Sequence, residues 1–203
     1  MQFFISGTGT DIGKTLVTSW LCAHSNYTYF KPIQTGAIHG TDSQTVAKFS
    51  KNKIHKECYV FKNPFSPQLA AQLENTSIDI KKIHLPKSDA LLVEGAGGLL
   101  VPINHNCYII DLIKQLKLPV ILVATTKLGT INHTLLSLEA LRYRAIPICG
   151  VIMSGDYNLD NSAAIARYGQ VEILGNLPYL KNITRSALLN IPLPNKLKKI
   201  LEV

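Results

Sequence analysis

The residues best suited to chemistry lie near the start of the chain, where a run of small residues ends in a lysine and a threonine. Residues 7–15 read Gly-Thr-Gly-Thr-Asp-Ile-Gly-Lys-Thr. The phosphate-binding loop has the pattern G-x-x-x-x-G-K-[ST], and here Thr8 stands in place of the first glycine, with Gly7 one residue further out. Small residues let backbone N–H groups face a polyphosphate, and the next helix adds its dipole. The run therefore predicts a nucleoside triphosphate site, with Lys14 on the β- and γ-phosphates and Thr15 on Mg²⁺, rather than a plain glycine-rich turn.

A carboxylate follows another apolar run. Glu94 comes after Leu-Leu-Val at 91–93 and before Gly-Ala-Gly-Gly at 95–98. A carboxylate at the carboxyl end of a buried strand is where a nucleoside triphosphatase holds Mg²⁺ or its water. A lone glutamate at such a place is more often a cap or a salt-bridge partner, but the phosphate-binding loop favours the metal interpretation.

A third candidate is the stretch 31–36, Lys-Pro-Ile-Gln-Thr-Gly, which follows an apolar run beginning at Tyr27. Lys31 at the end of a strand could neutralise a phosphoryl group in transfer. The proline and glycine would also be accounted for by a simple turn.

These residues need a parallel sheet to bring them together. Short apolar runs at 3–5, 27–31, 91–93, 120–123, 148–153 and 171–174 predict strands, and residues 14–24 and 131–141 predict helices. Weaker helical patterns cover 43–49 and 68–73, inside a 36–88 stretch that we interpret as a substrate-side insertion. Because the strands are apolar throughout, both faces should be covered by helices. We predict a single α/β domain over 1–203, a doubly wound and mostly parallel sheet of the P-loop NTPase type, with ligands at the carboxyl ends of its strands.

Composition narrows the class of protein. The chain has 203 residues, of which 46% are hydrophobic and 17% charged, with a formal charge of +8 that suits anionic partners. It shows no membrane span and no signal peptide, so we expect a cytoplasmic protein. Its cysteines are far apart, which predicts free thiols and no structural zinc. The only dense basic cluster, Lys196, Lys198 and Lys199, is interpreted as a solvated helix face rather than a nucleic-acid or membrane site.

Taken together, these motifs resemble the dethiobiotin synthetase family. The resemblance extends through Asp42, Pro-Phe-Ser-Pro at 64–67, residues 119–123, Lys-Leu-Gly-Thr-Ile-Asn-His at 127–133 and Gly-Asn-Leu-Pro at 175–178. It therefore covers the chain almost from end to end.

The resemblance implies a homodimeric ligase that converts 7,8-diaminononanoate, CO₂ and ATP into dethiobiotin, ADP and phosphate, with Mg²⁺ as the metal. It implies Lys31 and Lys14 as catalytic residues and Thr15, Asp42 and Glu94 as metal ligands. The nucleotide would be bound by Asp11, Ile12, Gly13, Lys14, Thr15, Leu16, Asp42, Glu94, Gly95, Ala96, Gly97, Ser154, Gly155, Pro178, Tyr179 and Leu180. The substrate would be bound by Thr35, Gly129, Thr130 and Asn132, the last three at a helix start that serves the partner subunit.

Several local interpretations compete with these roles. Thr41-Asp42 could instead begin a helix over 43–49 as an ordinary cap, and Thr130 could be an ordinary N-cap. Ser154 stands where the family commonly has an asparagine that pairs with adenine, so we expect only a modest preference for ATP, unless Asn158 supplies the amide. Leu135, Leu136, Leu138 and Leu141 occupy more than one helix face, as a dimer contact would require.

Two other classes of P-loop protein remain as alternatives. A switch ATPase of the partitioning or iron-protein type carries an additional lysine early in its loop, and residues 7–10 contain none. A small-molecule kinase would show an arginine-rich lid, but Arg142, Arg144, Arg167 and Arg185 do not cluster in one loop.

Overall fold

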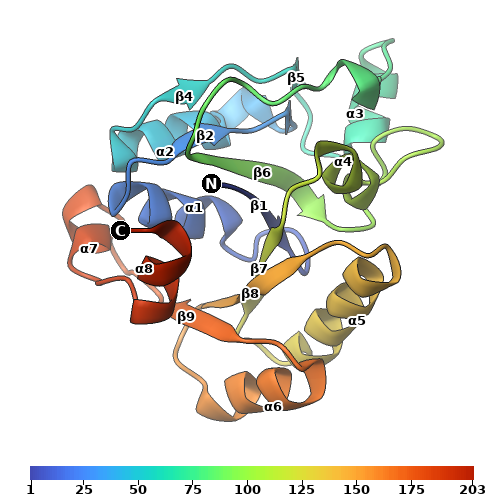
Figure 1. The fold of residues 1–203 in the computed structure, drawn as a ribbon. Helices are drawn as coiled ribbons and strands as arrows, with labels where there is room; N and C mark the ends of the chain where they lie inside the picture. The colour runs from blue at the N-terminus through green and yellow to red at the C-terminus, as the bar shows by residue number, and fades with distance from the viewer.

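The chain folds around one seven-stranded sheet in which all neighbouring strands are parallel (Figure 1). The computed structural model describes all residues, 1–203. The strand order is β4-β2-β6-β1-β7-β8-β9. From β1 the chain runs out to β2 and β4 on one side, returns to β6 between β1 and β2, and then runs out through β7, β8 and β9 on the other side. This confirms the doubly wound α/β class. The strands are β1 (Gln2–Gly7), β2 (Thr28–Phe30), β4 (Ile54–His55), β6 (Leu91–Gly98), β7 (Val120–Thr125), β8 (Ile148–Ser154) and β9 (Ile173–Leu177).

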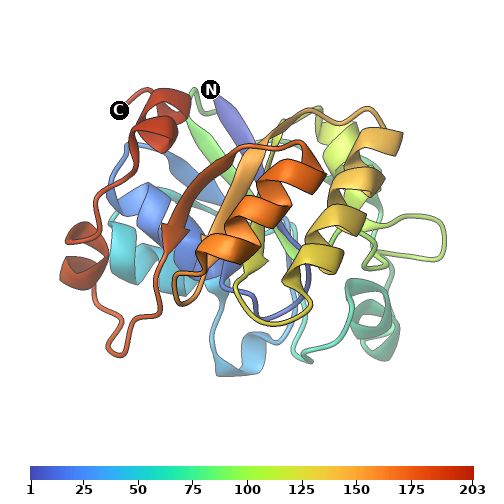
Figure 2. The same cartoon turned by 90° about the horizontal axis from the view of Figure 1, so that it is seen from below.

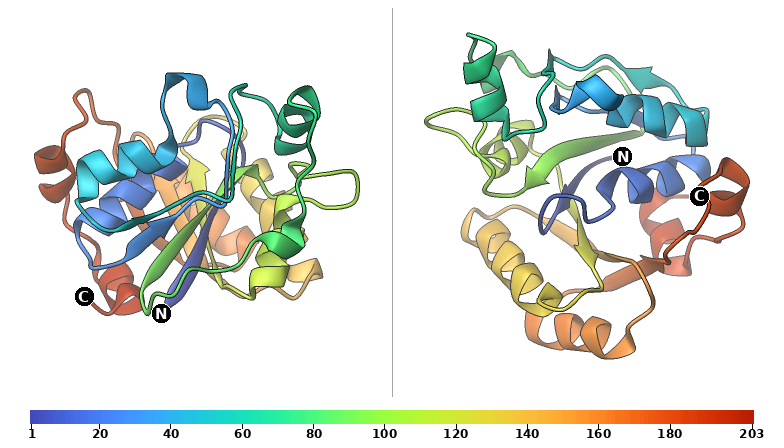
Figure 3. Two further views of the ribbon diagram at one scale, coloured as in Figure 1. Left: turned by 90° about the horizontal axis from the view of Figure 1, so that it is seen from above. Right: turned by 180° about the vertical axis from the view of Figure 1, so that it is seen from behind.

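Helices cover both faces of the sheet. One layer contains α1 (Lys14–Ala23), α2 (Asp42–Ser50), α7 (Arg185–Leu189) and α8 (Asn195–Leu201). The other contains α3 (Pro67–Leu73), α4 (Ile109–Leu116), α5 (Thr130–Tyr143) and α6 (Leu159–Gly169), with α5 and α6 side by side (Figure 2). Both termini lie toward the edge at which the strands begin (Figure 3). None of the helices is both long and apolar enough to span a membrane.

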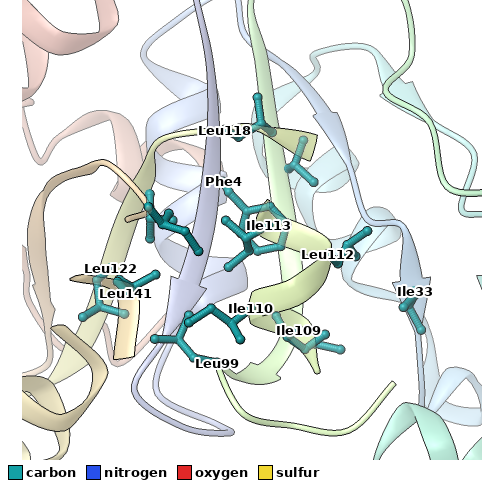
Figure 4. Packing of buried hydrophobic residues seen from close by; sticks show 14 of the residues in the cluster. Phe4, Ile33, Leu99, Ile109, Ile110, Leu112, Ile113, Leu118, Leu122 and Leu141 are labelled. Carbon is teal, nitrogen blue, oxygen red and sulfur yellow. The ribbon is translucent and has the colours of Figure 1, made fainter. Parts of the chain in front are cut away.

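The core is divided into two layers by the sheet, because successive strand residues point to opposite faces. Along β1, Phe4 packs with the α3–α6 layer, whereas Phe3 and Ile5 pack with the other layer. Figure 4 shows the first of these clusters, where Ile109 and Ile113 of α4 lie near the Phe4 ring. Such burial on both faces explains why the strands read as continuous apolar runs.

The structure corrects several expected boundaries. Strand β6 does not stop at Val93 but continues to Gly98, so Glu94 lies inside the strand. Strand β9 begins at Ile173 rather than Val171 and ends at Leu177.

Other elements were not predicted at all. Strands β3 (Ile33–Gln34), β4 and β5 (Tyr59–Val60) have two residues each, too few to show a pattern, and β3 pairs with β5 apart from the main sheet. Helices α4, α6 and α7 were also missed, as were the short 3₁₀ turns η1 (Ala37–His39) and η2 (Ile80–Lys82). In α6 only Ile165 and Gly169 are buried, so no helical periodicity was visible. The lysine cluster lies, as expected, on the exposed side of α8.

The start of α2 decides between two interpretations of Asp42. The N-cap is Thr41, whose hydroxyl accepts the Gln44 N–H, while the Gln44 side chain accepts the Thr41 N–H. This capping box leaves the Asp42 carboxylate free of capping. The cap interpretation is therefore confirmed for Thr41 and wrong for Asp42, which is the first residue of α2.

The capping box generates a stability prediction. Thr41→Ala should lower the free energy of unfolding by about 1 kcal/mol, because an N–H of the first turn of α2 loses its acceptor. Thr45→Ala, one helical turn later, removes the same atoms without removing a cap and should change stability by less than about 0.5 kcal/mol. Urea denaturation of both variants measures the difference; equal losses would contradict the role of Thr41.

Candidate active site

The site lies at the carboxyl ends of three neighbouring strands, β2, β6 and β1. A cavity of about 790 Å³ opens there, lined among others by Lys14, Thr15, Lys31, Asp42 and Glu94. It is also lined by the expected nucleotide and substrate residues Asp11, Ile12, Gly13, Leu16, Thr35, Ala96 and Gly97. The structure thus brings the phosphate-loop, Lys31 and Glu94 motifs to one place.

A register shift between β1 and β6 carries the glycines of β6 over the phosphate loop. Ile5 pairs with Glu94, but Gly7 pairs with Gly98, so residues 95–97 bulge out of the ladder. At Gly98 a Cβ atom would lie 3.5 Å from the backbone of Gly9. Strand β6 and the phosphate loop therefore pass each other at ordinary van der Waals distance.

Four side chains form a closed ring of polar contacts at the bottom of the cavity. The Lys31 Nζ lies 2.5 Å from Asp42 Oδ2 and 3.2 Å from Glu94 Oε1. The Thr15 hydroxyl lies 2.9 Å from Asp42 Oδ1 and 2.8 Å from the same Glu94 Oε1. Lys31 also donates to the Gly95 carbonyl at 3.1 Å.

Strand register explains why these groups meet. Phe30 of β2 pairs with Val93 of β6. The residues that follow them, Lys31 and Glu94, therefore lie at the same level of the sheet. Residues two apart on a strand share a face. Tyr29 therefore lies on the same side as Lys31, and its hydroxyl donates to Glu94 Oε2 at 3.1 Å.

Burial and charge act against each other in this ring. Glu94 is 1% exposed and Lys31 3%. Burial alone would lower the pKa of Lys31, but the Glu94 and Asp42 carboxylates outweigh it and the net shift is upward. Burial would raise the pKa of Asp42, yet Lys31 and the Thr15 hydroxyl hold it below its usual value. Burial and the Glu94 charge both raise the pKa of Tyr29 well above its ordinary value, which keeps the phenol a donor.

Lys14 is folded back on its own loop. Its Nζ donates to the Gly9 carbonyl at 2.7 Å. Burial lowers the pKa of Lys14 to about 8, although the Glu94 carboxylate acts in the opposite direction. Gly13, just before it, has φ of 94°, a left-handed conformation that glycine adopts without strain.

The donor set fits Mg²⁺. The three expected ligands, Thr15, Asp42 and Glu94, offer only oxygen atoms. The Thr15 hydroxyl lies 2.9 Å from Asp42 Oδ1 and 2.8 Å from Glu94 Oε1. No group of three His, Cys, Asp or Glu side chains suitable for a metal ion occurs in the structure. Mg²⁺ needs no such cage, since it is usually bound by one or two carboxylates together with substrate phosphates and water.

The residues expected around the nucleotide base lie beside the phosphate loop, at the ends of β8 and β9. A Cβ at Gly13 would lie 2.2 Å from Ser154 Oγ, so the two residues touch, and the Gly155 N–H donates to the Leu177 carbonyl at 3.0 Å. Pro178, Tyr179 and Leu180 follow β9, and Tyr179 is 72% exposed. None of these five expected base-site residues lines the 790 Å³ cavity.

Asn158, the alternative residue for the base site, caps helix α6. The Asn158 Oδ1 accepts the Asn161 N–H at 2.8 Å as the N-cap of α6, and Asn158 does not line the 790 Å³ cavity. The Asn158 alternative stays a hypothesis. The modest preference for ATP stays a prediction.

The expected substrate-carboxylate residues do not line the cavity either. Gly129, with φ of 91°, is the N-cap of α5, so the interpretation of Thr130 as N-cap is wrong. The buried Thr130 hydroxyl donates to the Thr125 carbonyl at 2.5 Å. The N–H groups of Ile131 and Asn132, in the first turn of α5, make no backbone hydrogen bond, as is usual at a helix N-terminus.

Three contributions to the site were missed in the sequence. Tyr29 could have been found from its two-residue spacing to Lys31. The Gln34 side chain accepts the Asp42 N–H at 2.9 Å and donates to the Thr35 carbonyl at 2.7 Å. The contact with Asp42 joins residues eight positions apart, and no local sequence pattern predicts it. The Gly95 carbonyl, which accepts from Lys31, carries no side-chain signal at all.

The two relatives named below, found by sequence comparison, bear the same name. A family model described as "AAA domain" matches residues 1–187. The ATP-dependent dethiobiotin synthetase BioD of Lawsonia intracellularis is 54% identical over 200 residues, covering 98% of both chains. The protein of the same name from Paramagnetospirillum magneticum is 45% identical over 193 residues, covering 94% of both chains. A crystal structure of a ParA family ATPase from Chlorobium tepidum matches with a TM-score of 0.51 at 14% identity, covering 99% of this chain and 92% of the other. This last likeness shows the fold alone.

The lowered pKa of Lys14 generates a prediction for nucleotide binding. Below pH 8 the ammonium is already charged, whereas above it each bound nucleotide must draw in a proton, since phosphate oxygens favour the charged form. The dissociation constant of a non-hydrolysable ATP analogue should therefore rise by up to about tenfold per pH unit above this value.

Calorimetry in buffers of different ionisation enthalpy would measure both the affinity and the proton uptake. Lys14→Arg is the control, because a guanidinium stays charged throughout the range. An affinity of the unaltered chain that did not change between pH 7 and pH 10 would contradict the prediction.

Proposed function

The chain belongs to the dethiobiotin synthetase family of ATP-dependent ligases, and we propose that it makes dethiobiotin from 7,8-diaminononanoate, CO₂ and ATP, with release of ADP and phosphate. The observation that carries the proposal is the meeting of Lys14, Lys31 and two carboxylates in one cavity beside the phosphate loop. That arrangement suits transfer of a phosphoryl group to an anionic acceptor.

The proposed reaction has three bond-forming steps. One amine of the substrate adds to CO₂ and loses a proton, which gives a carbamate. A carbamate oxygen attacks the γ-phosphorus of ATP, the bond to the β-phosphate oxygen breaks, and ADP leaves. The second amine then attacks the carbonyl carbon, the bond between that carbon and the phosphate oxygen breaks, and the ureido ring closes with loss of a proton.

Positioning and charge neutralisation supply the catalysis in this proposal. The acceptor carbamate and the γ-phosphate are both anions, so cations must hold them together. Lys14 would move from the Gly9 carbonyl to the β- and γ-phosphate oxygens, and Lys31 would bind the carbamate and the γ-phosphate. Mg²⁺ held by Thr15, Asp42 and Glu94 would neutralise phosphate charge. Thr35 lines the same cavity and would contact the carbamate end.

We further propose a homodimer in which the start of α5 binds the carboxylate of the substrate held by the partner subunit. The free N–H groups of Ile131 and Asn132 suit an anion, and they belong to an element outside the cavity that contains Lys31. Leu136 on the same helix is 57% exposed, which suits a contact surface. The four cysteines are free thiols, which suits the proposed location in the cytoplasm.

The product of the reaction tests the proposal directly. Incubation with ATP, Mg²⁺, the diamine and ¹³C-labelled bicarbonate should give a cyclic urea that carries the label, detected by mass spectrometry, with an equal amount of phosphate released. Lys14→Ala should slow product formation by roughly 10²–10³-fold, the range for losing one group that stabilises transition-state charge. Phosphate release that ignored the diamine or bicarbonate would instead indicate a switch ATPase.

A further inference from the structure

The Lys31 ammonium lies between the same carboxylates that are proposed to bind the metal. Its Nζ contacts Asp42 Oδ2 and Glu94 Oε1, and Thr15, the third proposed ligand, contacts the other Asp42 oxygen and the same Glu94 oxygen. We propose that Lys31 is a tethered cation that fills the metal-free site, and that an arriving divalent cation displaces it into the cavity. This inference rests on the proposed metal site.

The acidic pair requires a cation in every state. Thr15 has one hydroxyl hydrogen but lies within 2.9 Å of oxygens from both carboxylates, so it satisfies only one of them fully. Lys31 is the only side-chain cation within 4 Å of either carboxylate, because Lys14 is turned to the Gly9 carbonyl. Without Lys31 or a metal ion, a buried carboxylate would remain uncompensated.

Both cations cannot use these oxygens together. Mg²⁺ binds oxygen at about 2.0–2.1 Å. A metal at that distance from Glu94 Oε1 and an oxygen of Asp42 would lie close to an ammonium that contacts the same two groups. Repulsion between the two charges is strong because Lys31 and Glu94 are buried, where charges are less screened than in water.

Lys31 has room to leave. The 790 Å³ cavity is lined by Lys31 as well as by Thr35 and Gly97, so its flexible stem can place Nζ above the ring instead of within it. The displaced ammonium would then reach the region of the phosphate and carbamate. Metal binding and the movement of Lys31 toward the substrates are in this way one event. Phosphate groups that arrive without metal find Lys31 still bound to Asp42 and Glu94.

Metal affinity without nucleotide tests the exchange. Titration of Mn²⁺ followed by electron paramagnetic resonance should show tighter binding to Lys31→Met than to the unaltered chain, by about 5-fold to 150-fold, the usual range for coupled sites. Lys48→Met removes an exposed lysine of α2, the helix that carries Asp42, and should leave Mn²⁺ affinity unchanged. Equal or weaker binding to Lys31→Met would overturn the proposal.

A second measurement uses the unaltered chain, in case Lys31→Met does not fold. Acylation of lysines followed by mass spectrometry should show more labelling of Lys31 with Mg²⁺ present than without it, while labelling of Lys48 stays constant. Unchanged or reduced labelling of Lys31 would overturn the exchange. Neither readout needs the diamine or turnover, so failure of the exchange and failure of the proposed synthetase reaction remain distinguishable.

Discussion

A carboxylate inside a parallel sheet must be compensated where it lies, and Glu94 imposes this constraint on the whole site. It is 1% exposed and occupies the fourth position of β6, between strands β2 and β1. Its two oxygens contact Tyr29 of the neighbouring strand β2, Lys31 just after that strand, and Thr15 of the helix that follows β1. The polar side chains at the bottom of the cavity are thus arranged around the Glu94 carboxylate.

The order of strands makes this compensation possible. Because β6 is inserted between β1 and β2, motifs about sixty to eighty residues apart in the chain become immediate neighbours. The adjacent Asp42 comes from α2, where Thr41 takes over the capping role and Gln34 holds the Asp42 N–H. Two lysines line the same cavity but have different partners. Lys14 donates to a backbone carbonyl, whereas Lys31 contacts two carboxylates.

The sequence was sufficient to predict the sheet class and the meeting of residues 7–15, Lys31 and Glu94, because apolar runs and strand ends leave local patterns. It was not sufficient where a residue acts through a distant partner. The Gln34 contact with Asp42 depends on a turn, and the length of β6 depends on pairing with β1 rather than on apolar residues. Helix α6 was invisible because so few of its residues are buried. The alternative interpretation of Thr130 as the N-cap of α5 was also wrong, since Gly129 is the N-cap.

A double-mutant cycle tests most directly the claim that Glu94 and Lys31 compensate each other. The free energy of unfolding would be measured by urea denaturation, without metal, for the unaltered chain, Glu94→Gln, Lys31→Met and the double variant. Each single variant leaves a buried charge with a partner lost, which costs roughly 3–5 kcal/mol for a buried pair. The double variant should lose less than the sum of the two single losses, by roughly 1–3 kcal/mol. Losses that simply add would show that the two charges do not depend on each other and would contradict the account.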